Sequence, residues 1–243
     1  MKADPQLSAR PFLISFSGID GAGKTTQIEL LADSLQRKGF RVLRLSFWDD
    51  VAVCPTLRSS IGQHAADFYQ GSQPVRTPEA RNYKHIRKWY LTIARACLAA
   101  LDALRLRRMM ASRRLHAADV VIFDRYMYDQ FANIYSPSFL ANTCIRMIQK
   151  ITPRPDLAIF LDASPTNAHA RKPEYPLDFV YENRRAFLGL QKLFPELTTV
   201  PASEVEDTRN AIQAHIRQSR LAGMTRTNEA CEKYNCSPAT EFL

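Results

Sequence analysis

One short segment, GIDGAGKTT from Gly18 to Thr26, constrains this chain more than any other feature. It fits the pattern G-x-x-x-x-G-K-[ST], in which glycines let the backbone wrap a phosphate and the lysine reaches the β- and γ-phosphates. The segment follows an apolar run at 12–16 that is typical of a strand, and it opens a helical pattern at 25–38, which is the context that the motif requires. The sequence therefore predicts a phosphate-binding loop, the P-loop, for a nucleoside triphosphate.

Apolar runs typical of strands alternate with helical patterns along the rest of the chain, as in a parallel sheet that is covered by helices. Strands are expected at 12–16, 41–47, 119–123, 157–161 and, as a short one, 197–200. A strongly helical region at 79–116 is either two helices or one long bent helix, and another helix is expected at 204–218. The predicted fold class is α/β: a P-loop NTPase three-layer α/β/α sandwich with a mainly parallel sheet of about five strands.

The length of 243 residues suits one domain rather than two. We expect that domain to span 1–220, and the polar segment 221–243 to be a flexible tail. The first residues lack the apolar core of a secretory signal, and no run approaches the roughly 20 apolar residues of a membrane span. A cytoplasmic protein without membrane contact is therefore expected.

Lys and Arg outnumber Asp and Glu by 33 to 24, a balance that favours anionic partners such as nucleotides or nucleic acid. Much of the excess lies in RLRRMMASRR at 105–114, which is either the solvated end of a long helix or a phosphate-handling surface. The five cysteines are too scattered for a disulfide framework, and the five histidines lack metal-ligand spacing. Composition therefore points away from a disulfide-stapled or zinc-dependent protein.

A second signal lies in VVIFDR at 120–125. Four apolar residues followed by an acid are typical of a Walker-B strand, which would carry Asp124 to the edge of the sheet beside the P-loop. There the carboxylate could position Mg²⁺ or its bound water, and the hydroxyl of Thr25 could be a second metal ligand. Arg125 follows directly and could face the same cleft.

Three segments together resemble the thymidylate kinase-like family of P-loop nucleoside monophosphate kinases. The run ISFSGIDGAGKTTQIELLADSL at 14–35 looks like the opening of that family, and DRY at 124–126 is similar to its Asp-Arg-Tyr/Ser motif. The stretch from Leu161-Asp162 to the basic Arg171 resembles the family's strand leading into a lid. The ordered resemblance spans most of 12–216.

The resemblance implies ATP-dependent phosphoryl transfer to a nucleoside monophosphate, in the first place dTMP to dTDP, with ATP and Mg²⁺ as cofactors. It implies catalytic roles for Lys24, Asp20, Arg125 and Arg171, the last of these within a lid at about 165–182. It also implies a homodimer, and no nucleic acid partner is expected. The implied donor-binding residues are Gly18, Gly21, Ala22, Gly23, Lys24, Thr25 and Thr26.

The acceptor side departs from the family pattern. After the second strand the family commonly has Arg-Glu-Pro-Gly-Gly-Thr or a shorter acidic equivalent, whereas this chain has SFWDDV. The family's base-stacking Phe, four residues before an Arg, also has no clean match, although an aromatic ring nearby could stack on a base. The expected acceptor contacts are Asp49, Asp50, Trp89, Arg95, Arg125 and Tyr126. Core packing accounts equally well for Trp89 and for Tyr126.

Two alternatives stay open at this point. The altered segment 47–51 and the unusual lid favour a kinase of the same scaffold that acts on a nucleoside or another small acceptor. A nucleotide-dependent switch without turnover could use 105–114 as a partner surface, although the presence of Lys24, Asp124 and Arg125 argues for chemistry. A nucleic-acid-directed NTPase would need more sheet and more domains than this chain offers.

Overall fold

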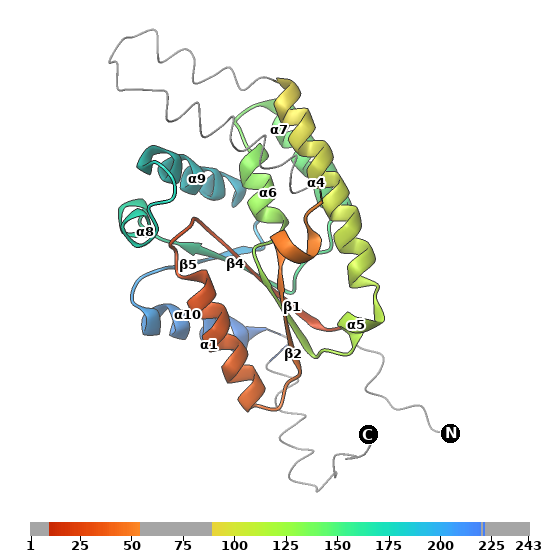
Figure 1. The fold of residues 1–243 in the computed structure, drawn as a ribbon, viewed down its shortest axis with the longest axis vertical. Coiled ribbons are helices and arrows are strands. Elements are labelled where there is room, and N and C mark those ends of the chain that lie inside the picture. Colours follow the sequence, from red (N-terminus) through yellow and green to blue (C-terminus); the bar gives the residue numbers. More distant parts are fainter. Residues whose placement is uncertain (1–9, 54–88, 220, 222–243) are drawn as a thin grey trace, which may run out of the picture.

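The computed structural model describes residues 10–53, 89–219 and 221 (Figure 1). Its core is one sheet of five parallel strands in the order β2-β3-β1-β4-β5. The strands are β1 (Phe12–Ser17), β2 (Val42–Ser46), β3 (Val120–Asp124), β4 (Leu157–Asp162) and β5 (Leu197–Pro201). Each lies where the sequence predicts a strand, so the α/β class and the parallel sheet are confirmed.

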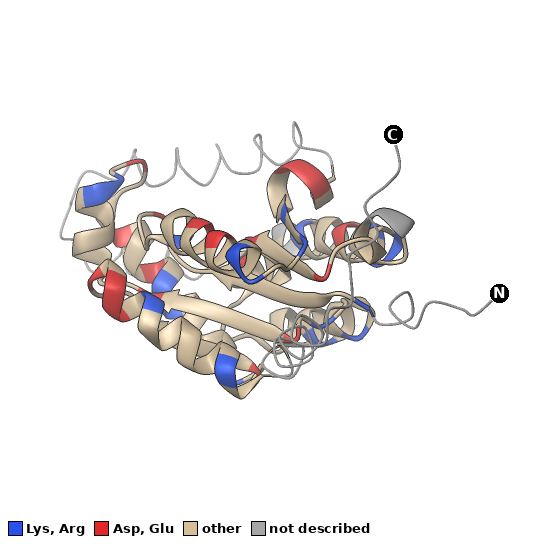
Figure 2. Ribbon diagram, turned by 90° about the horizontal axis from the view of Figure 1, so that it is seen from below, with Lys and Arg blue, Asp and Glu red and all other residues tan. Residues whose placement is uncertain are grey.

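Helices cover both faces of this sheet, as the view in Figure 2 shows. On one face α1 (Lys24–Arg37) packs against α10 (Val205–Gln218). On the other face lie α4 (Trp89–Met110), α6 (Met127–Ile134), α7 (Phe139–Ile151) and α9 (Leu177–Leu190). The short elements are the π-helix η2 (Phe47–Val51), α5 (Arg113–His116) and α8 (Pro165–Arg171). The predicted three-layer sandwich is therefore confirmed.

The register of the sheet brings several strand ends to one edge. β1 is buried at every residue, as expected for a central parallel strand with helices on both faces. Phe16 of β1 and Ser46 of β2 both lie opposite Asp124 of β3. The loops that leave the carboxyl ends of these strands therefore meet, and open α/β sheets bind their ligands at this edge.

The helical region predicted at 79–116 resolves into α4 and α5, separated by a turn at 111–112, with 79–88 outside the described residues. The sequence interpretation did not identify α7 or α9, whose patterns are interrupted by polar residues. Leu221 is buried, so packed structure reaches the first residue of the segment 221–243 that was predicted to be a tail. Among the described helices, none is both long and apolar enough to cross a membrane.

Candidate active site

The P-loop runs from the end of β1 into the first turn of α1. Gly23 caps α1 in the left-handed conformation, with φ 85° and ψ 17°, which glycine adopts without steric cost. Thr25 and Thr26 are exposed in the first helical turn, where free N–H groups and the helix dipole favour an anion. A β-carbon on Gly21 would collide with the carbonyl oxygen of Ala168 in α8, so only glycine allows that helix to approach the loop.

Lys24 lies beneath this loop and is only 7% exposed. Its Nζ donates hydrogen bonds to the carbonyl oxygens of Gly18 and Ile19, each at 2.9 Å. Burial, helped by the charge of Arg125, lowers the pKa of Lys24 to about 8, although nearby carboxylates pull in the opposite direction. The ammonium is thus poorly solvated, and a phosphate next to it would interact strongly.

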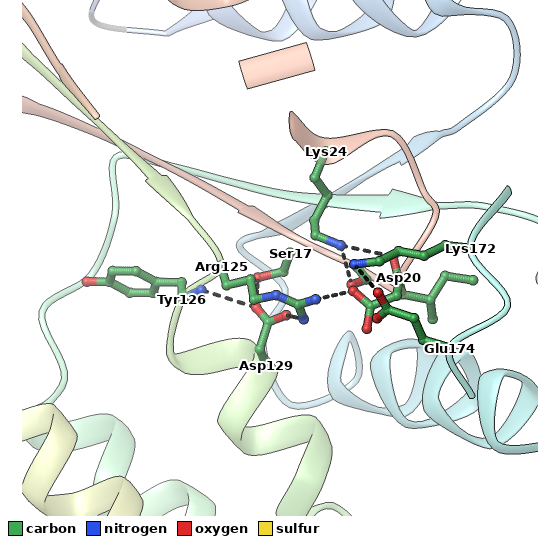
Figure 3. A network of polar contacts seen from close by, with 10 residues as sticks. Ser17, Asp20, Lys24, Arg125, Tyr126, Asp129, Lys172 and Glu174 are labelled. Carbon is green, nitrogen blue, oxygen red and sulfur yellow. Dashed lines mark hydrogen bonds and ion pairs between the residues drawn. The ribbon is translucent and has the colours of Figure 1, made fainter. Parts of the chain in front are cut away.

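Arg125 extends from the end of β3 toward Asp20 of the P-loop, as Figure 3 shows. It is the one non-glycine residue with a positive φ, 65°, in the described part of the chain, and its N–H donates to the Phe16 carbonyl at 2.9 Å. Its guanidinium forms ion pairs with Asp20 of the P-loop and Asp129 of α6. Burial works to lower the pKa of Arg125, but the surrounding carboxylates outweigh it and raise that pKa, so the side chain stays charged.

Asp129 is the buried member of this network. One oxygen accepts hydrogen bonds from Ser17 Oγ at 2.7 Å and from the N–H of Tyr126 at 3.1 Å, and the other accepts from Arg125 NH1 at 3.2 Å. Burial raises the pKa of Asp129, against the pull of Arg125 and Lys24. The carboxylate joins the end of β1, the first turn of α6 and the arginine into one unit.

The helix α8 places Arg171 over the P-loop. Arg171 NH1 lies 3.5 Å from the carbonyl oxygen of Gly21, at the upper limit of a hydrogen bond. The neighbouring Lys172 instead pairs with Glu174 at 3.1 Å, and both of those side chains are exposed. Of these two neighbouring basic residues, Arg171 is therefore the one that contacts the loop.

A further ion pair at the base of this lid region was not predicted. Arg184 of α9 donates two hydrogen bonds to Asp162 at the end of β4, Nε to Oδ1 at 2.5 Å and NH2 to Oδ2 at 2.8 Å. These hydrogen bonds raise the pKa of Arg184. A two-pronged contact of this kind fixes orientation as well as distance, so it ties α9 to the sheet edge beside the P-loop.

Two of the residues expected on the acceptor side lie at the surface. Asp49 and Asp50 lie in η2, and both are exposed. Asp50 is engaged locally, because its Oδ2 accepts a hydrogen bond from the N–H of Ser46 at 2.8 Å. Trp48 is 38% exposed and packs edge-to-face on the buried Phe47. Asp49 makes no such hydrogen bond within residues 10–53 and 89–219.

Arg95 and Tyr126 do not converge on the P-loop in the same way. Arg95 NH1 lies 3.4 Å from the carbonyl oxygen of Asn133 in α6. Tyr126 is fully buried, its ring meets Phe123 edge-to-face, and its hydroxyl donates to the Pro153 carbonyl at 2.7 Å. The expected acceptor contact through the Tyr126 side chain is therefore corrected to core packing. Trp89 begins α4, and its side chain lies outside the described part of the structure.

Named relatives match the chain along most of its length, although no family model matches it. It is 30% identical over 222 residues to a protein of Pyrococcus horikoshii named probable thymidylate kinase, and the match covers 87% of this chain and 98% of the relative. This chain belongs to the thymidylate kinase family. A protein of the same name in Methanosphaera stadtmanae is 29% identical over 208 residues, covering 84% and 94%. The fold agrees with that of Candida albicans thymidylate kinase, with a TM-score of 0.59 and 18% identity over 87% of this chain and 93% of the other.

Two oxygen-bearing side chains fit the Mg²⁺ expected of a thymidylate kinase-family protein. Thr25 is exposed in the first turn of α1, and Asp124 is half-buried at the end of β3, close enough to Lys24 for its charge to act on the pKa of that lysine. Mg²⁺ commonly binds through one or two carboxylates together with substrate phosphates. Within the described residues there is no cluster of three His, Cys, Asp or Glu that could hold a metal.

Proposed function

We propose that this member of the thymidylate kinase family transfers the γ-phosphoryl group of ATP to dTMP and forms dTDP. The observation that carries the proposal is the gathering of Lys24, Arg125 and Arg171 around a complete P-loop. Family membership supports dTMP as the acceptor. Phosphoryl transfer needs mainly positioning and charge stabilisation, so three cations and a metal are a sufficient set.

Each residue of the set has a distinct role in this proposal. The N–H groups of the P-loop and of the first turn of α1, with Lys24, bind the β- and γ-phosphates of ATP. Arg125 contacts the phosphates between which the group moves, and Asp20 lies beside it near the acceptor phosphate. Arg171 stabilises the charge that develops on the moving group. Mg²⁺, held by Thr25 and Asp124, would neutralise charge between the β- and γ-phosphates.

A second candidate function is a kinase of the same scaffold with a different acceptor. It is favoured by the geometry of η2, where the Asp50 carboxylate already accepts a hydrogen bond from the N–H of Ser46 and Trp48 is partly exposed. The site, rather than the fold, decides which acceptor reacts.

The test is an ADP-release assay with ATP and Mg²⁺ against dTMP, dUMP, UMP, CMP, AMP, GMP and the matching nucleosides. Turnover with dTMP far above all other acceptors is the expected result. Turnover with another acceptor alone would overturn the assignment of dTMP and keep the kinase. ATP binding without turnover on any of them would overturn the proposed reaction.

We also propose that the protein is a homodimer that pairs through α4 and α7. Both helices carry exposed apolar side chains at helical spacing: Ile93, Leu101 and Leu104 on α4, and Phe139, Leu140 and Met147 on α7. Light scattering should then give twice the 27.7 kDa of one chain. Leu101→Glu combined with Met147→Glu should give monomers, whereas Val205→Glu, at an exposed apolar residue of α10, should not. A monomeric wild type would refute the dimer.

A further inference from the structure

Arg125 shares its guanidinium between two carboxylates that differ in character. NH1 bonds to Asp129, whose side chain is 4% exposed, and NH2 bonds to Asp20, whose side chain is 21% exposed. Asp20 belongs to the P-loop, the proposed phosphate site, and is half-buried. Asp129 belongs to the core beneath it (Figure 3). The two acids therefore cannot play the same part.

Asp129 is fixed by contacts that have nothing to do with a substrate. Its Oδ2 is bonded to Ser17 Oγ and to the N–H of Tyr126, so it is anchored to the last residue of β1 and to the start of α6. Moving this carboxylate would leave those buried donors unpaired, which is costly. The Asp129 carboxylate is thus fixed in place and can hold the long, flexible side chain of Arg125.

The backbone of Arg125 also shows that its position is imposed by its surroundings. A positive φ of 65° is unfavourable for a residue with a side chain, and it persists only where neighbouring contacts over-determine it. Two such contacts are the N–H bond to the Phe16 carbonyl and the ion pair with Asp129. Together they direct the guanidinium from the end of β3 toward Asp20 and Lys24.

We propose that Asp129 is a positioning residue that holds Arg125 for phosphoryl transfer, and that Asp20 is the exchangeable partner that a phosphate replaces. The proposal rests on the kinase function proposed above. A guanidinium held in advance loses little freedom when the reacting phosphates reach it, and such preorganisation is what makes charge stabilisation effective. Asp129 itself touches no substrate in this scheme and acts only through Arg125.

The test is a double-mutant cycle with Asp129→Asn and Arg125→Ala, read as kcat/KM for dTMP. The side-chain oxygen of Asn can still accept hydrogen bonds from Ser17 and from the N–H of Tyr126. Its amide nitrogen would face the Arg125 guanidinium as a second donor, and the negative charge is lost. In the wild-type background Asp129→Asn should lower kcat/KM about tenfold to one-hundredfold, the range expected for a hydrogen bond between charged groups. In the Arg125→Ala background the same change should cost less than about twofold.

A matched control is Asp119→Asn, just before the start of β3 and so at the end of the strands opposite the P-loop. Asp119 also pairs with an arginine, Arg41, at 2.7 Å and accepts the N–H of that residue, but it lies away from the P-loop. Its substitution should leave kcat/KM unchanged. Equal losses from Asp129→Asn in both backgrounds would assign it a purely structural role and overturn the proposal.

Side-chain NMR tests the same idea without turnover, so it separates this proposal from the kinase assignment. In the wild-type protein without nucleotide, the Nε–H of Arg125, identified by its loss in Arg125→Ala, should be more ordered than that of Arg171. This measurement also decides the matter if Asp129→Asn does not fold. An Arg125 as mobile as Arg171 would overturn the proposal even if dTMP is phosphorylated. An ordered Arg125 in a protein that does not phosphorylate dTMP would refute only the kinase assignment.

Discussion

The donor half and the acceptor half of the site differ in how their functional groups are held. Lys24 is buried and bonded to two carbonyl oxygens of the loop, and Arg125 is held by two acids and by its own backbone. Asp49 is exposed in η2, and Arg95 NH1 lies 3.4 Å from the carbonyl oxygen of Asn133, away from the P-loop residues. The residues proposed to bind phosphate are thus held by the core of the fold, whereas Asp49, proposed for the acceptor, lies on the surface and can change without disturbing that core.

The largest effect should come from removing the charge of Lys24 in the donor half. We expect Lys24→Met to lower kcat by about three orders of magnitude or more, because the β- and γ-phosphates lose their buried cation. The fold should stay intact, since methionine fills a similar volume and an unfavourably buried charge disappears. Turnover by the ADP-release assay and melting temperature by calorimetry measure the two effects.

The matched control is Lys38→Met, at an exposed lysine at the end of the same helix, which should change neither quantity. Near-normal turnover in Lys24→Met would show that the donor half is not organised around this lysine.

The lid arginine should matter less to binding than to the reaction. We expect Arg171→Ala to lower kcat by about tenfold to one-hundredfold and to weaken ATP binding only about twofold, because its long contact with Gly21 tightens only when charge develops. Lys172→Ala is the control, since Lys172 is already paired with Glu174. Calorimetric ATP titration and steady-state kinetics separate the two quantities. Parallel losses in both would make Arg171 a simple ATP-binding residue.

The same contrast explains what the sequence could predict. The P-loop is contiguous, and its glycines, lysine and flanking strand and helix have local signatures, so the strands and the start of α1 at this loop were predicted at their positions. Asp129 had a weak signal, its spacing of four residues after Arg125, which suits a pair on one helical turn. Its burial beneath β1 comes from the packing of α6, which no local pattern encodes.

Long-range contacts account for the other omissions. The two-bond ion pair between Arg184 and Asp162 joins residues that are close only because α9 packs back against the sheet. Tyr126 follows Arg125 directly in sequence, but the backbone of Arg125 has a positive φ and the Tyr126 ring is buried in the core. The sequence thus predicted a contact between Tyr126 and the acceptor because the residue follows Arg125, but in the folded structure the ring is buried.

The lowered pKa of Lys24 gives a pH test of the donor half. Above pH 8 the buried ammonium loses its proton, so kcat/KM for ATP should fall about tenfold per pH unit between roughly pH 8 and 10. Stability should move in the opposite direction. The unfolded chain, with the lysine near its ordinary pKa of 10.5, binds more protons in this window, so the free energy of unfolding rises by up to about 3 kcal/mol.

Denaturant titrations from pH 7 to 10.5 measure this rise, and Lys24→Met should abolish it. A rise of the same size in Lys24→Met would mean that another group titrates, and the burial of Lys24 would lose its energetic support.

The acceptor half offers the smallest effects and a natural matched pair in Asp49 and Asp50. We expect Asp49→Ala to raise KM for dTMP about threefold to tenfold and to leave the melting temperature unchanged, because this exposed acid contributes to recognition and not to packing. Asp50→Ala should do the reverse. It removes the acceptor of the Ser46 N–H bond, which contributes about 0.5–1 kcal/mol and thus a few degrees of melting temperature.

Steady-state kinetics and calorimetry on the two variants provide the comparison. If Asp50→Ala raised KM and Asp49→Ala only lowered the melting temperature, the acid beside the acceptor would be Asp50, and its bond to Ser46 would then have to break when the acceptor binds. The acceptor half would in that case be rebuilt by its ligand, while the donor half, with Lys24 bonded in the core, is already formed.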